Sequence, residues 1–175
     1  MTRQNLFLVG PMGSGKSAVG RQLARSLGLE FHDSDDAIEQ RTGVDIPFIF
    51  EKEGEAGFRR REEEMIGELA ALDDIVLATG GGAILSAENR RVLAARGTVI
   101  YLAATIDQQV ARTRHGRERP LLTGRDSREV LASLMGEREP LYREIADLVI
   151  ETDGRKVPAV CREIIERLDR LAGSS

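Results

Sequence analysis

Several residue types are scarce in this chain, and each scarcity excludes a class of protein. Tryptophan is absent and aromatic residues make up only 4%, so no aromatic platform for stacking nucleic-acid bases is expected. Cys161 is the single cysteine, which excludes an internal disulfide and suits a reducing compartment. No run approaches the roughly 18 apolar residues of a membrane-spanning helix. The N-terminal apolar run, Leu6–Val9, is also too short for a signal peptide. We therefore expect a cytoplasmic protein without a membrane partner.

The chain also lacks a large excess of charge of either sign. The chain has 25 Lys and Arg against 29 Asp and Glu, a net charge of −4, which argues against a nucleic acid or an anionic membrane held by bulk charge. Hydrophobic residues make up 41%, close to the share usual in globular proteins. A length of 175 residues favours one domain, which we place at residues 1–175.

Short apolar runs of strand length alternate with helical patterns. The runs lie at Leu6–Val9, Leu29–Phe31, Ile75–Ala78, Val99–Leu102 and Leu148–Ile150. Five other segments have the spacing of apolar residues or the capping residues that are typical of helices. They are Val19, Leu23 and Leu27; Phe58, Met65, Leu69 and Leu72; the capping box Thr105–Gln108; Val130, Leu131 and Leu134; and Val160, Ile164, Leu168 and Leu171. Strands that alternate with helices predict an α/β fold with a parallel sheet covered on both faces.

The strongest motif is GPMGSGKS at residues 10–17, which fits G-x-x-x-x-G-K-[ST] between an expected strand and an expected helix. Its glycines let successive backbone N–H groups point at phosphate oxygens, and the start of the helix adds a positive potential. We expect Lys16 to reach the terminal phosphates and the Ser17 hydroxyl to bind Mg²⁺. The predicted ATP-binding residues of this loop are Gly13, Ser14, Gly15, Lys16, Ser17 and Ala18.

Two aspartates, Asp33 and Asp35, follow the second apolar run at the carboxyl end of an expected strand. Open α/β sheets bind ligands at this edge, so these carboxylates would face the phosphate loop. Magnesium takes oxygen ligands, and phosphoryl transfer to an alcohol benefits from a carboxylate at the acceptor hydroxyl. The alternative is that acidic residues at positions 33–36 only cap the next helix.

A carboxylate lies on the apolar face of the next helical pattern, because Phe58, Glu62 and Met65 share one side of a helix. Burying it alone would be costly, and Arg59 is the obvious partner three residues earlier. Glu62 would then orient the Arg59 guanidinium toward a bound anion, or the two would form only a structural ion pair. The pattern alone leaves both interpretations open.

Three further features have weaker signals. Gly80–Gly82 follow the third apolar run, and they are more glycines than a flexible turn requires, which suggests close approach of a ligand to the backbone. Arg138 lies near the end of a helical pattern, where the helix dipole alone would explain an exposed arginine. Residues 112–126 are rich in Arg and interrupted by Gly and Pro, as in a mobile basic flap or a solvated loop.

Taken together, the motifs resemble the shikimate kinase family over about residues 5–160. The resemblance rests on GPMGSGKS at 10–17, F-x-D-S-D at 31–35, E-x-R-T-G at 39–43, G-E-x-x-F-R-x-x-E at 54–62, T-G-G-G at 79–82, R-P-L-L at 119–122 and R-x-P-L-Y at 138–142. Only the first motif is widely shared. The resemblance implies a three-layer P-loop kinase fold with a five-stranded parallel sheet in the order 2-3-1-4-5 flanked by helices. It also implies a substrate-binding region at about 33–62 and a mobile lid at about 112–126.

The resemblance further implies transfer of the ATP γ-phosphate to the 3-hydroxyl of shikimate, in the chorismate route to aromatic amino acids. Shikimate and ATP would be the small-molecule partners of a monomer, with Mg²⁺ as cofactor and no nucleic acid. The implied roles are catalysis by Lys16, Asp35 and Arg119; shikimate binding by Asp35, Arg59, Gly80, Gly81, Gly82 and Arg138; further ATP contacts by Arg112, Arg119 and Arg155; and a metal site at Ser17 and Asp33. Because no aspartate follows the third apolar run, the metal would otherwise rely on phosphate oxygens and water.

Two other functions compete with this one. The first is a related kinase that phosphorylates gluconate or a nucleoside monophosphate. Arg59, Arg138 and the glycines favour an acceptor with a carboxylate, which a nucleoside monophosphate lacks. The second is a nucleotide-dependent switch, which would turn over ATP without any acceptor. Release of ADP across a panel of acceptors distinguishes all three.

Overall fold

The computed structural model describes residues 4–113 and 127–173, and its centre is one parallel sheet. The sheet has five strands in the order β2-β3-β1-β4-β5, which confirms the expected fold. The strands are β1 (Leu6–Val9), β2 (Glu30–Asp33), β3 (Ile75–Ala78), β4 (Thr98–Ala103) and β5 (Leu148–Glu151). The helices of the described ranges are α1 (Lys16–Leu27), α2 (Ser34–Thr42), α3 (Ile46–Ala70), the 3₁₀ helix η1 (Ala83–Leu85), α4 (Ala87–Arg96), α5 (Ile106–Thr113), α6 (Ser127–Ile145) and α7 (Val157–Gly173).

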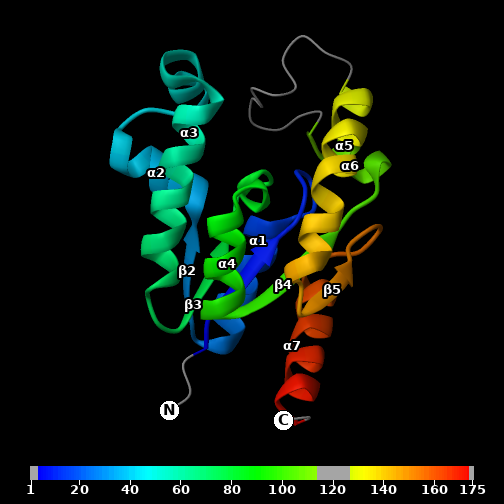
Figure 1. Ribbon diagram of the computed structural model, residues 1–175. Coiled ribbons are helices and arrows are strands. Elements are labelled where there is room, and N and C mark those ends of the chain that lie inside the picture. The colour runs from blue at the N-terminus through cyan, green and yellow to red at the C-terminus, as the bar shows by residue number, and fades with distance from the viewer. Residues whose placement is uncertain (1–3, 114–126, 174–175) are drawn as a thin grey trace.

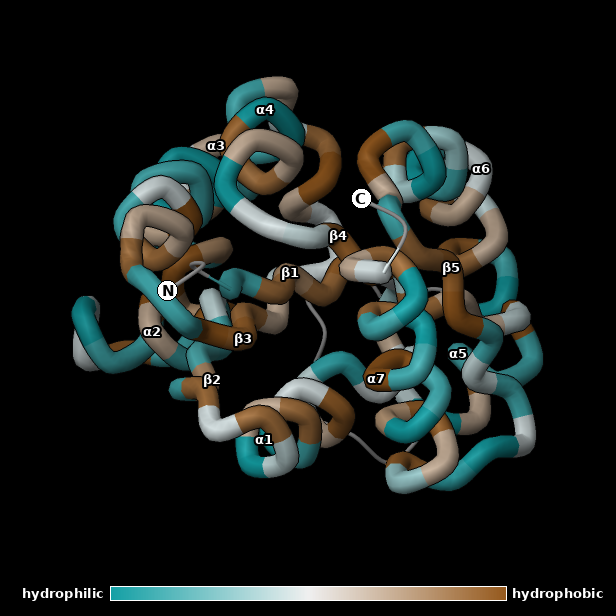
Figure 2. Tube along the Cα trace, turned by 90° about the horizontal axis from the view of Figure 1, so that it is seen from below, coloured by the Kyte–Doolittle hydropathy of each residue, from teal (hydrophilic) through white to brown (hydrophobic). Residues whose placement is uncertain are grey.

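Helices cover both faces of the sheet and make three layers, as Figure 2 shows from below. Successive residues of a strand point to opposite faces. Leu6 and Leu8 of β1 therefore pack into a core cluster that includes residues of α1 and α7, whereas Phe7 and Val9 pack into a second cluster with residues of α3, α4 and α6. The central strand is buried on both sides, which is why its sequence is a continuous apolar run and not an alternating one.

All strands run in the same direction, so their carboxyl ends lie along one edge of the sheet, at the top of Figure 1. The segments that follow β1, β2 and β3 leave the sheet there. These segments hold the phosphate-loop motif, Asp35 and the three glycines, and Asp33 is the last residue of β2. The fold therefore brings three motifs that are far apart in the sequence to one edge.

The structure corrects two details of the helical patterns. Helix α3 ends at Ala70, so Leu72 does not continue its apolar stripe and is 42% exposed. Arg138 is not an exposed residue at a helix end: α6 continues through Pro140 to Ile145, and Arg138 is only 3% exposed. Packing of α6 against the core, which a local sequence pattern does not report, decides where this helix ends and what it buries.

Candidate active site

The loop between β1 and α1 forms one wall of a cavity of about 260 Å³. Gly15 is the N-cap of α1 and has a φ of 88°, a left-handed conformation that favours glycine. Lys16 extends back over the loop and donates hydrogen bonds from Nζ to the carbonyl oxygens of Gly10 and Pro11, at 2.7 and 2.9 Å. The cavity is lined by Met12, Gly13, Gly15, Lys16, Ser17, Ala18, Asp33, Asp35, Thr79, Gly80, Gly81 and Arg112. The structure thus brings the loop, both aspartates and two of the glycines together.

Arg112 and Arg155, the arginines expected near the nucleotide, have different surroundings. Arg112 lies against the phosphate loop, since a Cβ placed on Gly15 would be 3.4 Å from its Nη1. Arg155 donates to a carboxylate oxygen of Glu163 at 2.6 Å and to the carbonyl oxygens of Glu151 and Ala159. It is therefore anchored to the turn between β5 and α7. Arg119 lies outside the described residues.

Gln108 is a neighbour of the phosphate loop that sequence reasoning missed. In a capping box the side chain of the last residue returns to the backbone of the first. Its backbone N–H does donate to the Thr105 hydroxyl at 3.2 Å, but its side chain donates instead to Gly13 O, at 3.4 Å, and to the Thr152 hydroxyl, at 2.9 Å. Asp153 accepts the backbone N–H of Thr105 at 2.9 Å. The capping pattern correctly indicated the start of α5, but it carries no information on the contacts of this side chain with Gly13 and Thr152.

Asp33 both caps a helix and lies beside the phosphate loop, so the two interpretations of this residue are compatible. Its Oδ1 accepts the backbone N–H groups of Asp35 and Asp36 at the start of α2, at 2.9 and 3.1 Å, and its Oδ2 accepts the Ser17 hydroxyl at 2.6 Å. A hydroxyl and a carboxylate at the phosphate loop are the hard oxygen donors that Mg²⁺ prefers. Among the described residues no group of three or more His, Cys, Asp or Glu could hold a metal. The donor set fits a magnesium ion bound mainly through phosphate oxygens and water.

Gly80, directly beyond Thr79 at the end of β3, lies where two carboxylates converge. A Cβ placed on it would be 2.9 Å from both Asp35 Oδ1 and Glu62 Oε2. Its backbone N–H donates to the hydroxyl of buried Ser34 at 3.2 Å. Absence of a side chain at position 80 therefore lets α2 and α3 present both carboxylates at this corner of the cavity.

Glu62 is the buried carboxylate that the apolar stripe predicted, with 1% exposure. Arg59 Nη1 donates to its Oε1 at 2.9 Å, while Oε2 is buried and has no hydrogen-bond partner in the described part of the chain. Burial raises the pKa of Glu62, and this effect outweighs the opposite influence of Arg59 and Arg138. Arg59 is held on its other side by Glu55, at 3.6 Å from Nη2. The pair is therefore built into the core while the guanidinium itself reaches the glycine turn.

Arg59 and Arg138 contact the glycine turn from two different helices. A Cβ on Gly82 would be 2.3 Å from Arg59 Nη2, and a Cβ on Gly81 would be 3.5 Å from Arg138 Nη1. Burial lowers the pKa of Arg138, although a guanidinium remains protonated in proteins. Two cationic side chains thus meet the glycine turn at Gly81 and Gly82, while Asp35 meets it at Gly80. This arrangement suits an anion at one end of a small ligand and a hydroxyl at the other.

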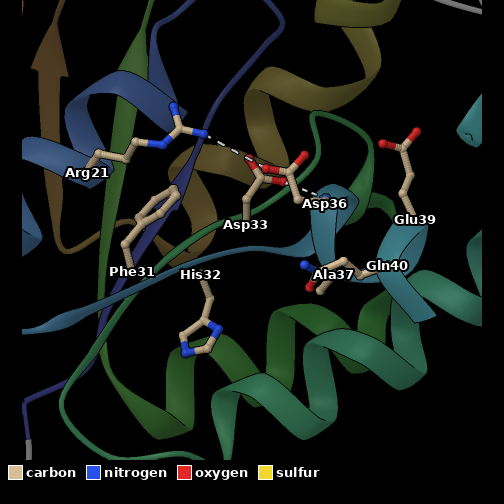
Figure 3. Close-up of a pocket in the computed structure, with 8 residues that line it drawn as sticks. All are labelled: Arg21, Phe31, His32, Asp33, Asp36, Ala37, Glu39 and Gln40. Carbon is tan, nitrogen blue, oxygen red and sulfur yellow. Dashed lines mark hydrogen bonds and ion pairs between the residues drawn. The ribbon is translucent and has the colours of Figure 1, made fainter. Parts of the chain in front are cut away.

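A second hollow, of about 570 Å³, lies beside β2 and α2 (Figure 3). Arg21 reaches toward its carboxylates, 3.9 Å from Asp36, and stacks over the Phe31 ring at 5.2 Å. The hollow shares Asp33 with the first cavity but includes no residue of the phosphate loop or of the glycine turn. This second hollow is larger than the first cavity, but its lining includes neither the backbone N–H groups of the phosphate loop nor the glycines of the turn after β3 with the arginines that contact them. We therefore assign the active site to the first cavity.

A phosphate loop next to an anion-binding corner, at the carboxyl edge of a five-stranded parallel sheet, defines a P-loop kinase of small molecules. The chain belongs to the shikimate kinase family, whose pattern it matches over residues 12–169. It is 57% identical to the shikimate kinase of Shewanella frigidimarina over 95% of this chain and 97% of that one. It is 58% identical to that of Pseudomonas syringae pv. syringae over 96% and 98%.

Solved structures agree with this assignment. The shikimate kinase from Acinetobacter baumannii in complex with shikimate superposes with a TM-score of 0.93 at 48% identity, covering 95% of this chain and 93% of that one. A gluconokinase from Sinorhizobium meliloti 1021 superposes with a TM-score of 0.61 at 15% identity, over 98% of this chain and 95% of that one, which shows a shared fold alone. Among the described helices, none is both long and apolar enough to cross a membrane.

Proposed function

We propose that this protein transfers the γ-phosphoryl group of ATP to the 3-hydroxyl of shikimate, giving shikimate 3-phosphate and ADP. The observation that carries the proposal is the meeting of Arg59 and Arg138 with the glycine turn, next to Asp35 and the phosphate loop. Shikimate has one carboxylate and three hydroxyls, so two guanidinium groups suit one end of it and an aspartate suits the other. The relative from A. baumannii was solved with shikimate bound, which supports the same acceptor here.

The phosphate loop would bind the donor. Its backbone N–H groups and the start of α1 surround the phosphates of ATP, and the Nζ of Lys16 exchanges its two loop carbonyls for phosphate oxygens. Ser17 and Asp33 would hold Mg²⁺, directly or through water, and the metal supplies positive charge at the phosphates when it is bound. Arg112 lies beside the loop, where it would contact the nucleotide.

The acceptor corner would orient shikimate for in-line transfer. Arg59 and Arg138 hold its carboxylate, and Gly80, Gly81 and Gly82 let its ring approach the backbone. The 3-hydroxyl oxygen forms a bond to the γ-phosphorus while the bond from that phosphorus to the bridging oxygen of ADP breaks. Asp35 accepts the proton of the hydroxyl.

The experiment that tests the proposal measures ADP release with shikimate, with gluconate, with a nucleoside monophosphate and without acceptor. We expect rapid release only with shikimate. Faster release with gluconate or with the nucleoside monophosphate would assign a related kinase activity. Equal release with and without acceptors would instead point to a nucleotide-dependent switch.

We also propose that the protein works in the cytoplasm as a monomer with a single domain, since one sheet holds all five strands and one of its edges carries both ends of the site. Light scattering after size-exclusion chromatography tests the oligomeric state. A dimer that dissociates into inactive monomers on dilution would contradict this proposal.

A further inference from the structure

Tyr142 is a buried side chain that connects two parts of the acceptor corner. It lies one helical turn after Arg138 on α6, on the same side of the helix, and is 1% exposed. Its hydroxyl donates a hydrogen bond to the carbonyl oxygen of Gly81 at 2.5 Å, and Arg138 Nη1 lies beside the same residue, 3.5 Å from a Cβ placed on Gly81. The Tyr142 hydroxyl and the Arg138 guanidinium therefore meet the glycine turn at the same residue.

We propose that Tyr142 is a positioning residue that fixes the Gly81 peptide and the Arg138 guanidinium relative to each other, and thereby sets the site for the acceptor carboxylate. This inference rests on the proposed function. In a trans peptide the carbonyl and the following N–H point in opposite directions. Holding Gly81 O toward α6 thus turns the Gly82 N–H away from it. Arg138 Nε is buried and has no hydrogen-bond partner among the described atoms, so the position of the guanidinium depends on the groups packed around it, which include the turn that Tyr142 holds.

The ring and the hydroxyl of Tyr142 have separable roles. The ring stacks on Tyr101 of β4, with centroids 5.0 Å apart and planes at 27°, and belongs to the core cluster on that face of the sheet. Burial raises the pKa of Tyr142, so the hydroxyl remains protonated and remains a donor at any pH at which the enzyme works. Removing only the hydroxyl should leave the packing in place and release the turn.

Tyr101 provides a matched control. It is equally buried, it stacks on the same ring, and its hydroxyl donates to the Glu139 carboxylate and not to the glycine turn. Tyr101→Phe and Tyr142→Phe therefore each remove one buried hydroxyl from the same cluster. A purely structural role predicts similar losses of stability and similar kinetics for the two variants.

The experiment compares these two variants with the wild type by KM for shikimate, KM for ATP, kcat and the urea midpoint of unfolding. For Tyr142→Phe we expect a rise of about three- to tenfold in shikimate KM, the factor that one net hydrogen bond is worth, with ATP KM and kcat changed less than about twofold. For Tyr101→Phe we expect a similar shift of the midpoint and an unchanged shikimate KM. Equal shikimate KM values in the two variants would overturn the proposal.

A double-variant cycle adds a second readout. Arg138→Lys removes the planar fork that Tyr142 restrains, so the effect of Tyr142→Phe on shikimate KM should be smaller in that background. The effect of Tyr101→Phe should stay absent. Strictly multiplicative effects of Tyr142→Phe and Arg138→Lys would overturn the assigned role. Failure of the proposed function is distinct, because the wild type itself would then release no ADP with shikimate.

Discussion

The donor end and the acceptor end of the active site are built in different ways. The donor end comes mainly from one continuous segment, residues 10–17, to which Asp33 and Arg112 are added from elsewhere in the chain. The acceptor end gathers Asp35 from α2, Arg59 and Glu62 from α3, the glycine turn after β3 and Arg138 from α6. Two of these charged side chains, Glu62 and Arg138, are almost completely buried.

This difference separates chemistry from specificity. A phosphate loop works by local geometry and can serve many acceptors, because every nucleoside triphosphate presents the same phosphates. The acceptor corner depends on packing between helices that are distant in sequence, and its buried charges are part of the core. Substitutions at the donor end should therefore abolish turnover without unfolding, whereas substitutions at the acceptor end should change affinity for one substrate and, for the buried groups, stability as well.

The largest effect is expected at the donor end. Lys16→Met should lower kcat by ~10³ to 10⁵, the range for removing a cation from a transferring phosphoryl group. The unfolding midpoint should change little, because the Nζ of Lys16 donates hydrogen bonds to carbonyl oxygens of its own loop and does not pack into the core. Steady-state kinetics and urea denaturation of the same preparation check this. A folded variant with near-normal kcat would contradict the role of Lys16.

The two aspartates should divide the chemistry between the two ends. Asp35→Asn should lower kcat by ~10² to 10⁴ even at saturating magnesium, because an amide cannot accept the hydroxyl proton. Asp33→Asn should be partly rescued by raising the magnesium concentration, because Asp33 lies against Ser17 at 2.6 Å. Magnesium titrations of kcat for both variants check the division. Rescue of Asp35→Asn instead would exchange the two roles.

The arginines should affect one substrate only. Arg59→Lys and Arg138→Lys keep a positive charge but lose the planar fork, so shikimate binding should weaken by about 1.5 to 3 kcal/mol each, while ATP binding changes much less. Isothermal titration with each ligand measures both. Equal weakening of the two ligands would indicate a general folding defect.

The arrangement of the donor end could be predicted largely from the sequence, whereas that of the acceptor end could be predicted only in part. The pattern of residues 10–17 specifies a loop on its own. The apolar stripe correctly indicated that Glu62 is buried and paired with Arg59. Arg138 gave no such signal, since its burial depends on how α6 packs, and the role of Tyr142 depends on a contact with Gly81, which is remote in sequence.

Gly82 allows the acceptor end to be altered without touching a charged residue. Its φ of −94° suits any residue, but a Cβ would be 2.3 to 2.7 Å from the Arg59 guanidinium. Gly82→Ala should therefore displace Arg59 and raise shikimate KM by about tenfold, since one misplaced charged hydrogen bond is worth about 1.4 kcal/mol.

Gly136→Ala is the matched control for that substitution. Gly136 lies in α6, two residues from Arg138, and a Cβ there meets nothing within 4 Å. This variant should keep the wild-type KM and gain about 0.4 to 1 kcal/mol of stability from the reduced freedom of its unfolded chain. Kinetics and urea denaturation check both variants. A Gly82→Ala enzyme with normal shikimate KM would show that Arg59 can shift without cost.

The smallest effect is expected from removing the buried acidic charge, and its pH dependence has a definite sign. Burial raises the pKa of Glu62 above its ordinary value of 4.5. As the pH rises above 4.5, the Glu62 carboxyl loses its proton in the unfolded chain before it does so in the folded protein. The free energy of unfolding of the wild type therefore falls, by at most about 1.4 kcal/mol per pH unit, until the pH reaches the raised pKa of the folded protein. Glu62→Gln lacks this slope. Its stability relative to the wild type should therefore increase as pH rises through that window.

The control for Glu62→Gln is a carboxylate on the same helix with the opposite shift. Glu68 is exposed, and its hydrogen bond with Arg41, at 2.6 Å, lowers its pKa. A carboxyl group whose pKa is lowered by folding stabilises the folded protein at pH values above its ordinary pKa, and this stabilisation is lost as the pH falls. Glu68→Gln should therefore become less stable relative to the wild type as the pH rises. It should leave the KM for shikimate unchanged. Glu62→Gln should raise that KM a few-fold, because Arg59 loses a charged partner. Denaturation series for the three proteins across pH test the signs. Parallel curves for Glu62→Gln and the wild type would show that Arg59 cancels the effect of burial on the pKa of Glu62, and the acceptor end would then carry no net penalty from this buried charge.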